Sequence, residues 1–246
     1  MASDKPLIDV GVSAPPMCQR TRARRLPLHS PRPQAIYLLF MALSFPLFAQ
    51  QTSIVTFTLD FPGSEPSHYF ISVSSDGRSA YDSDGKLSAE SDADPFHLDF
   101  SVSPSTRNAI FDLAKRAHYF EGEIDSKKRG LASTGAKTLT YKDDQRNTRA
   151  TYNFSPITAV QQLTQLFQNL SATLEFGRRL QYFHHYQKLA LDQELKRMED
   201  MANQNGLEEL GAVAPILQEI ASDSSVINPV RARAQRMAQR AESLKQ

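Results

Sequence analysis

The chain has 246 residues and a net charge of +1, from 28 Lys and Arg against 27 Asp and Glu, and 40% of its residues are hydrophobic. This composition is typical of a globular protein of one large or two small domains, and it excludes a largely disordered chain. The first 49 residues hold six of the basic and two of the acidic residues, which leaves 22 basic and 25 acidic residues, a net charge of −3, for the rest. A mildly acidic body argues against general nucleic-acid binding, which requires a basic face.

Residues 1–49 follow the pattern of a secretory signal peptide. Five arginines between Arg20 and Arg32 precede the apolar run Ala35–Leu43, which continues to Ala49. The run falls short of the roughly 20 apolar residues that span a bilayer. We expect cleavage after Ala49, with the start at Met1 or at Met17; the alternative is an uncleaved N-terminal anchor. The single cysteine, Cys18, lies in this leader, so the mature chain can form no disulfide bond.

Residues 50–170 carry the alternating pattern of β-strands. Strands are expected at 53–61, 69–73, 78–82 and 96–102, with a tight turn at Asp76-Gly77. Ser103 and Pro104 are typical of a helix start, which predicts a helix over Pro104–His118. A loop at 121–134 leads to a second predicted hairpin, formed by 137–142 and 147–154.

This order of elements predicts an α+β fold, in which an antiparallel sheet has helices on one face and an all-helical C-terminal region follows. The residues expected in the core of the sheet region are Phe57, Leu59, Ile71, Phe100, Ile110, Leu113, Tyr152 and Phe154.

The stretch 157–201 is apolar at helical spacing and joins the two regions. Its stripe over 160–174 is offset by roughly a quarter to a third of a turn from its stripe over 180–201. Either a helix breaks near 171–177, with Gly177 as the hinge, or one long helix packs on two different bodies. The first stripe should face the sheet, and the second should face the helical tail through Leu191, Leu195 and Met198.

Residues 171–246 are assigned to the helical C-terminal region, which ends in a helical pair over 207–244. The pair resembles a single HEAT-type repeat in Pro215, Leu217, Asp223, Val230-Arg231 and Ala234. One repeat cannot bury its own apolar face, so we expect the pair to pack on the second half of the long stretch. Over about 54–170, the hairpin–helix–hairpin–helix order with the Ser75-Asp76-Gly77 turn is similar to small uncharacterised domains of bacterial secreted and periplasmic envelope proteins. This resemblance implies no catalytic residue.

The polar residues identify no catalytic residue, and no metal or cofactor site is expected. His184 and His185 are adjacent and point about 100° apart on a helix, whereas a helical metal pair needs i,i+4 spacing. Asp82-Ser83-Asp84-Gly85 resembles part of a calcium loop, but Ala80 and Ser91 occupy two ligand positions. We therefore expect surface histidines and a solvated acidic loop containing Asp82, Asp84, Glu90, Asp92 and Asp94.

Two clusters of basic residues have the charge to bind an anionic partner. Lys127-Lys128-Arg129 falls in the predicted loop, where solvation is expected. The last helix carries Arg231, Arg233, Arg236 and Arg240, for which we expect ion pairs with Glu208, Glu209 or Glu219.

These features predict an exported, non-enzymatic protein, periplasmic or secreted, that binds another envelope protein. No nucleic-acid partner is expected, and membrane contact is expected only through an uncleaved leader. The alternative is an envelope hydrolase that uses carboxylates and a histidine. If two of His68, His97 and His118 converge with a carboxylate in a cleft, the enzyme is favoured; if they scatter over the surface, it is disfavoured.

Overall fold

Six antiparallel strands form one sheet in the computed structural model, which describes residues 52–87 and 92–243. The strand order is β4-β3-β2-β1-β5-β6. The strands are Ile54–Asp60 (β1), His68–Ser74 (β2), Arg78–Ser83 (β3), Phe96–Ser101 (β4), Ala136–Lys142 (β5) and Asn147–Tyr152 (β6). All six predicted strands are present, and the α+β fold is confirmed. The predicted leader lies outside the described residues.

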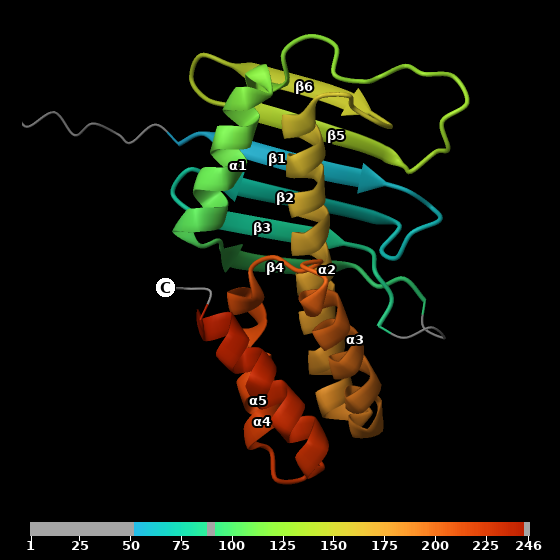
Figure 1. Cartoon of the computed structure of the whole chain (residues 1–246), viewed down its shortest axis with the longest axis vertical. Coiled ribbons are helices and arrows are strands. Elements are labelled where there is room, and N and C mark those ends of the chain that lie inside the picture. Colours follow the sequence, from blue (N-terminus) through green and yellow to red (C-terminus); the bar gives the residue numbers. More distant parts are fainter. Residues whose placement is uncertain (1–51, 88–91, 244–246) are drawn as a thin grey trace, which may run out of the picture. The chain divides into compact units, whose positions relative to one another are not determined.

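One face of the sheet is covered by α1 (Pro104–Arg116) and α2 (Thr158–Tyr186), which cross the strands (Figure 1). Side chains alternate between the two faces of a strand, and the apolar set turns toward the helices. Phe57 of β1 pairs with Ile71 of β2 and Leu139 of β5, and its ring stacks on Phe167 of α2 with 5.3 Å between centroids. The opposite face is polar; the hydroxyls of Thr56 and Thr140 bond there across adjacent strands.

The start of α1 follows from its capping residues. The Ser103 hydroxyl accepts a hydrogen bond from the Thr106 N–H at 3.3 Å, and Pro104 occupies the first turn, where its missing N–H costs nothing. Ile110 and Leu113 are buried in the core of the sheet region as predicted, and Ala114 is buried beside them. A short 3-10 turn, η1 (His118–Phe120), follows the helix.

Helix α2 is continuous, so the alternative with a break near 171–177 is wrong and one long helix meets both bodies. The chain leaves α2 at Gln187, passes through the 3-10 turn η2 (Lys188–Ala190) and returns as α3 (Leu191–Asn203). Gly177 is not a hinge. A Cβ atom at this position would lie 2.5 Å from Cγ1 of Val213, so the glycine allows the turn η3 (Leu210–Val213) to approach the helix closely.

Helix α2 contributes to two separate hydrophobic cores. Its N-terminal part packs with the sheet and α1 in the first core. From Phe176 onward it packs in the second core with α3, η3, α4 (Ala214–Ser222) and α5 (Asn228–Ser243). We call the part of the chain from Phe176 to Ser243 the helical half. Leu163, Phe167 and Leu170 lie in the first core and Leu191, Leu195 and Met198 in the second, as the offset stripes predicted. The expected domain boundary between 170 and 171 falls inside α2 and stays a prediction.

Two residues predicted for the core are not buried. Phe100 is only half-buried because β4 is an edge strand with a neighbour on one side. Phe154 follows the end of β6 and is 44% exposed. Alternation predicts which way a side chain points, but the covering depends on elements that are distant in sequence. The other six predicted core residues are buried.

Candidate functional site

The histidines considered for catalysis lie apart on the surface. On the polar face of the sheet, His68 Nδ1 is 2.5 Å from Asp60 and His97 Nδ1 is 2.7 Å from Asp82. The hydrogen bond to Asp82 raises the pKa of His97. His118 is exposed in η1. None of the three lines a cavity described below, so the criterion that would favour the hydrolase is not met.

The acidic residues of this loop hydrogen-bond to other parts of the chain. Within the part of the chain that the structure describes, no three His, Cys, Asp or Glu side chains are placed to hold a metal ion. Asp84 accepts hydrogen bonds from the Ser67 hydroxyl and the His68 N–H, both at 2.8 Å. Asp94 accepts one from Arg178 at 3.1 Å. Glu90 lies outside the described residues.

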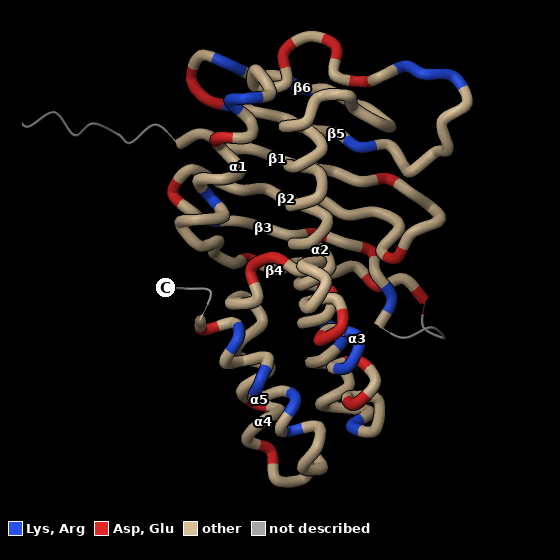
Figure 2. The backbone as a smooth tube through the Cα atoms, in the orientation of Figure 1, with Lys and Arg blue, Asp and Glu red and all other residues tan. Residues whose placement is uncertain are grey.

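The basic groups also have partners within the chain, but the partners expected for the last helix are wrong. Arg233 and Arg236 both pair with Glu199 of α3 at 3.1 Å. Arg240 donates to the Asn203 side chain at 2.8 Å, and Arg231 donates to the Ala221 carbonyl at 3.3 Å. In the exposed loop, Lys127 pairs with Glu123. Figure 2 shows acidic and basic residues interspersed along the helical half.

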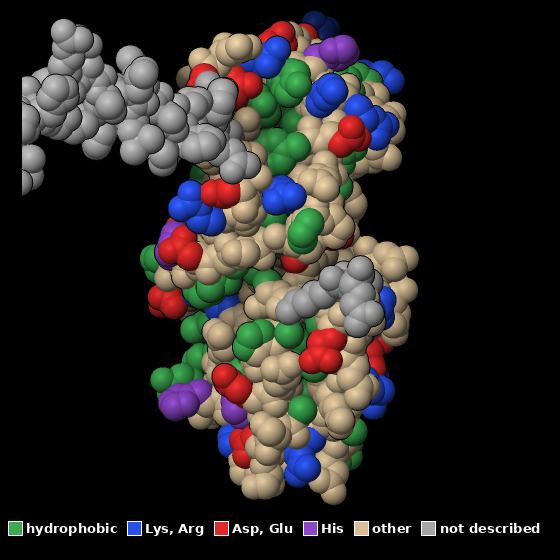
Figure 3. All heavy atoms as spheres, turned by 90° about the vertical axis from the view of Figure 1, so that its left-hand side faces the viewer, with side chains coloured by type: hydrophobic (Ala, Val, Ile, Leu, Met, Phe, Trp, Pro, Cys, Tyr) green, Lys and Arg blue, Asp and Glu red, His purple; other side chains and the backbone are tan. Residues whose placement is uncertain are grey.

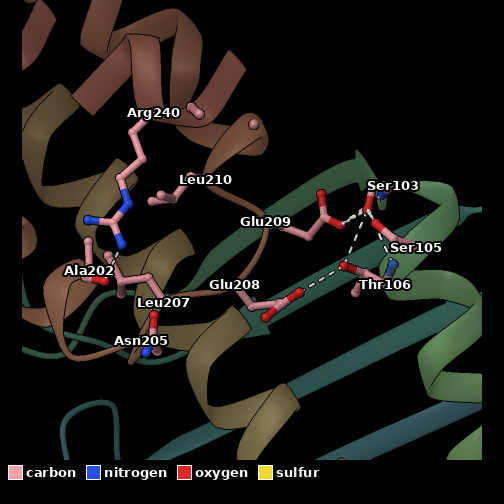
Figure 4. A pocket seen from close by; sticks show the side chains of 12 residues that line it. Ser103, Ser105, Thr106, Ala202, Asn205, Leu207, Glu208, Glu209, Leu210 and Arg240 are labelled. Carbon is pink, nitrogen blue, oxygen red and sulfur yellow. Dashed lines mark hydrogen bonds between the residues drawn. The ribbon is translucent and has the colours of Figure 1, made fainter. Parts of the chain in front are cut away.

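A cavity of about 300 Å³ lies between the start of α1 and the helical half (Figure 4). Glu208 and Glu209, which follow α3, line it on one side, and Arg240 of α5 lies on the opposite wall. Glu209 Oε1 accepts hydrogen bonds from the N–H and hydroxyl of Ser103 at 2.9 and 2.5 Å. The Thr106 hydroxyl donates to Glu208 Oε1 at 2.9 Å. Both carboxylates therefore tie the helical half to the start of α1.

The environment of these two carboxylates differs. Glu209 lies at the N-terminus of α1, where the helix dipole favours negative charge. Burial, reinforced by the charge of Glu209, raises the pKa of Glu208, although the hydrogen bond from Thr106 opposes this shift. No histidine or cysteine is among the described residues that line the cavity. The hydrogen bonds to Ser103 and Thr106 engage one oxygen of each carboxylate in this tie.

A buried charge cluster lies where α2 passes from the first core to the second. Glu175 is 2% exposed, and its Oε1 accepts hydrogen bonds from Tyr81 at 2.9 Å and Ser83 at 2.6 Å. The Nη1 atoms of Arg178 and Arg179 lie 3.9 and 4.0 Å from its Oε2. Sequence reasoning missed this cluster, although acidic and basic residues at i, i+3 and i+4 within an apolar stretch were a usable signal. Because a buried charge requires compensation, the cluster fixes α2 against β3.

Exposed aromatic and aliphatic side chains lie at the end of α2 and in the turn η2 after it. We call the half-buried Tyr182 and the exposed His185, Tyr186 and Leu189 the aromatic patch. Tyr186 is 68% exposed, and Leu189, in η2, is 95% exposed. The ring centroids of Tyr182 and Tyr186 are 5.2 Å apart, and those of His185 and Tyr186 are 4.3 Å apart. In Figure 3, hydrophobic and histidine side chains lie together at the surface of the helical half.

Comparison with known proteins assigns no family. A scan against protein-family models finds no match, and no curated protein matches the chain. The resemblances to envelope domains and to a HEAT-type repeat stay predictions. Among the described helices, none has the length and apolar character needed to cross a membrane.

Proposed function

We propose that the mature chain is an exported protein that binds another protein of the bacterial envelope through the aromatic patch. The leader pattern in residues 1–49 supports export. The proposal of binding rests on the exposure of Tyr186 and Leu189. Single exposed apolar residues are common, but here Leu189 follows a cluster of aromatic rings by three residues. Exposed apolar patches of this kind mark contact surfaces.

The patch has the chemistry of a protein-binding surface. Tyrosine is enriched among the residues that dominate binding energy, because it combines a large apolar ring with a polar hydroxyl. Complete burial of a leucine side chain contributes roughly 1.5–3 kcal/mol. A partner that covers Leu189 and the ring of Tyr186 would therefore gain apolar contact, while His185 offers it a hydrogen-bonding group.

Polar contacts attach the end of α2 and the turn η2 to the turn between α4 and α5. Asp223, in the turn between α4 and α5, accepts a hydrogen bond from Lys188 at 2.6 Å and lies 2.9 Å from His184 Nε2. These contacts, led by Lys188, hold the pKa of Asp223 well below its usual range. Because Lys188 belongs to η2, the turn that carries Leu189 is anchored before any partner binds. Such pre-organisation lowers the entropy cost of association.

Affinity capture from the envelope fraction tests the proposal. The mature chain would be compared with a variant that carries both Tyr186→Ser and Leu189→Ser. A matched control is Leu131→Ser, because Leu131 is also exposed but lies in the loop before β5. We expect the unaltered chain and the control to retain the same partner and the double variant to lose it. Equal capture by all three, with unchanged thermal stability, would contradict binding through the patch.

A further inference from the structure

A cavity of about 260 Å³ beside the end of β6 contains a buried lysine. Lys137 of β5 is 5% exposed and lies on the helix-covered face of the sheet, on the same side as Leu139. Its Nζ donates to the carbonyls of Thr134 and Asn153, both at 3.0 Å, and to the Thr134 hydroxyl at 2.8 Å. These acceptors are all neutral, so hydrogen bonds satisfy the ammonium group without cancelling its charge.

The lining of the cavity supplies no negative charge. Helix α2 contributes uncharged side chains, among them Gln161, Gln165 and Gln168. Besides Lys137, Tyr152 of β6 is the titratable residue among the described residues of the lining. Burial raises the pKa of Tyr152 to about 12, which keeps the phenol neutral near neutral pH. Burial also lowers the pKa of Lys137, and no carboxylate is among the described residues that line the cavity. When protonated, Lys137 therefore produces a positive potential that the lining does not neutralise.

We propose that this cavity binds a small organic monocarboxylate, whose charge compensates the ammonium of Lys137. One positive charge surrounded by amides and hydroxyls suits a monoanion better than a multiply charged phosphate. Phe154, at 44% exposure, offers an apolar wall for the remainder of the ligand. The exposed Gln161 and Gln165 show that the cavity opens to solvent. Its volume lies below that of a typical site for a drug-sized molecule, so the ligand has few atoms.

Butyrate and butyramide test the proposal, because they have nearly the same size and differ in charge. Each would be titrated into the isotope-labelled mature chain while backbone and glutamine side-chain amides are followed by NMR. We expect butyrate to shift the signals of Thr134, Asn153 and Gln165 with a Kd on the order of 1 mM or tighter, and butyramide to bind at least about tenfold more weakly. Equal effects of the two compounds, or no saturable shift with butyrate, would overturn the proposal.

Lys137→Met removes the charge at similar length and should abolish the response to butyrate. Lys128→Met is the matched control, because Lys128 is exposed in the loop before β5, and it should respond as the unaltered chain does. Butyrate binding that persists in the Lys137→Met variant would reject the role of the ammonium. If that variant loses its fold, the comparison of butyrate with butyramide on the unaltered chain still decides the question.

Discussion

The carboxyl group of Glu208 is partly buried where the helical half meets the start of α1. Its pKa is raised above the ordinary value of 4.5, so the folded chain holds this proton to a higher pH than the unfolded chain does. The free energy of unfolding therefore falls as pH rises through the interval between the two pKa values. Above that interval the ionised, partly buried carboxylate weakens the fold.

Glu208→Gln removes this titration while an amide oxygen can still accept the Thr106 hydrogen bond. We expect the variant to melt at a higher temperature than the unaltered chain at about pH 7 and at nearly the same temperature below both pKa values. Thermal melts across this pH range provide the measurement. Glu219→Gln, at an exposed site on α4, is the control and should leave the pH profile unchanged. A Glu208→Gln profile parallel to that of the unaltered chain would mean that Glu208 does not titrate differently on folding.

At the scale of elements, the long helix α2 connects every layer of the structure. Period-two alternation predicted the strands, and the Ser103-Pro104 pair predicted the start of α1, because both signals are local. The continuity of α2 was not predictable, since offset stripes arise equally from a broken helix and from one helix with two partners. In the folded chain the helix stays continuous, and Gly177 lies close to Val213, a residue far away in sequence.

Gly177→Ala tests this contact. Alanine favours a helix over glycine by about 1 kcal/mol, but overpacking a core costs about 1–3 kcal/mol. Because Val213 is itself buried, we expect a net loss of roughly 1 kcal/mol in the free energy of unfolding, measured by denaturant titration. In a Val213→Ala background the same change should be neutral or stabilising. A gain in stability with Val213 present would show that η3 does not approach α2 this closely.

The candidate sites were less predictable than the fold for the same reason. Tyr186 and Leu189 fall between apolar positions of a helical stripe, but the structure places them at the last residue of α2 and in η2, where both are exposed. In the sequence, nothing distinguishes Lys137 from an ordinary strand residue. Its neutral oxygen partners come from the loop at Thr134 and the end of β6 at Asn153, and no sequence pattern connects these three positions.

On the scale of the whole molecule, two cores share one helix. The sheet and α1 bury the first part of α2. The tail, residues 207–246, buries both the second part of α2 and α3. Glu208 and Glu209 add polar ties between the tail and the start of α1. Loss of the tail should therefore uncover one core and leave the other intact.

Deletion of residues 207–246 should expose Leu191, Leu195 and Met198, which are fully buried in the complete chain. We expect this truncated chain to bind a hydrophobic dye or to aggregate, while the amides of β1 and β2 stay protected from hydrogen exchange. The complete chain is the control. A truncated chain that stays monomeric and binds no dye would show that the tail does not cover α3.

Binding of an envelope protein at the aromatic patch would place Leu189 in contact with the partner. Photocrosslinking in the native cell tests this contact, with a photoreactive residue in place of Leu189 or, as the control, Leu131. We predict a discrete crosslinked product from position 189 and none from position 131, both carried by a chain that has lost residues 1–49. The same products from both positions, or none from position 189, would contradict the claim.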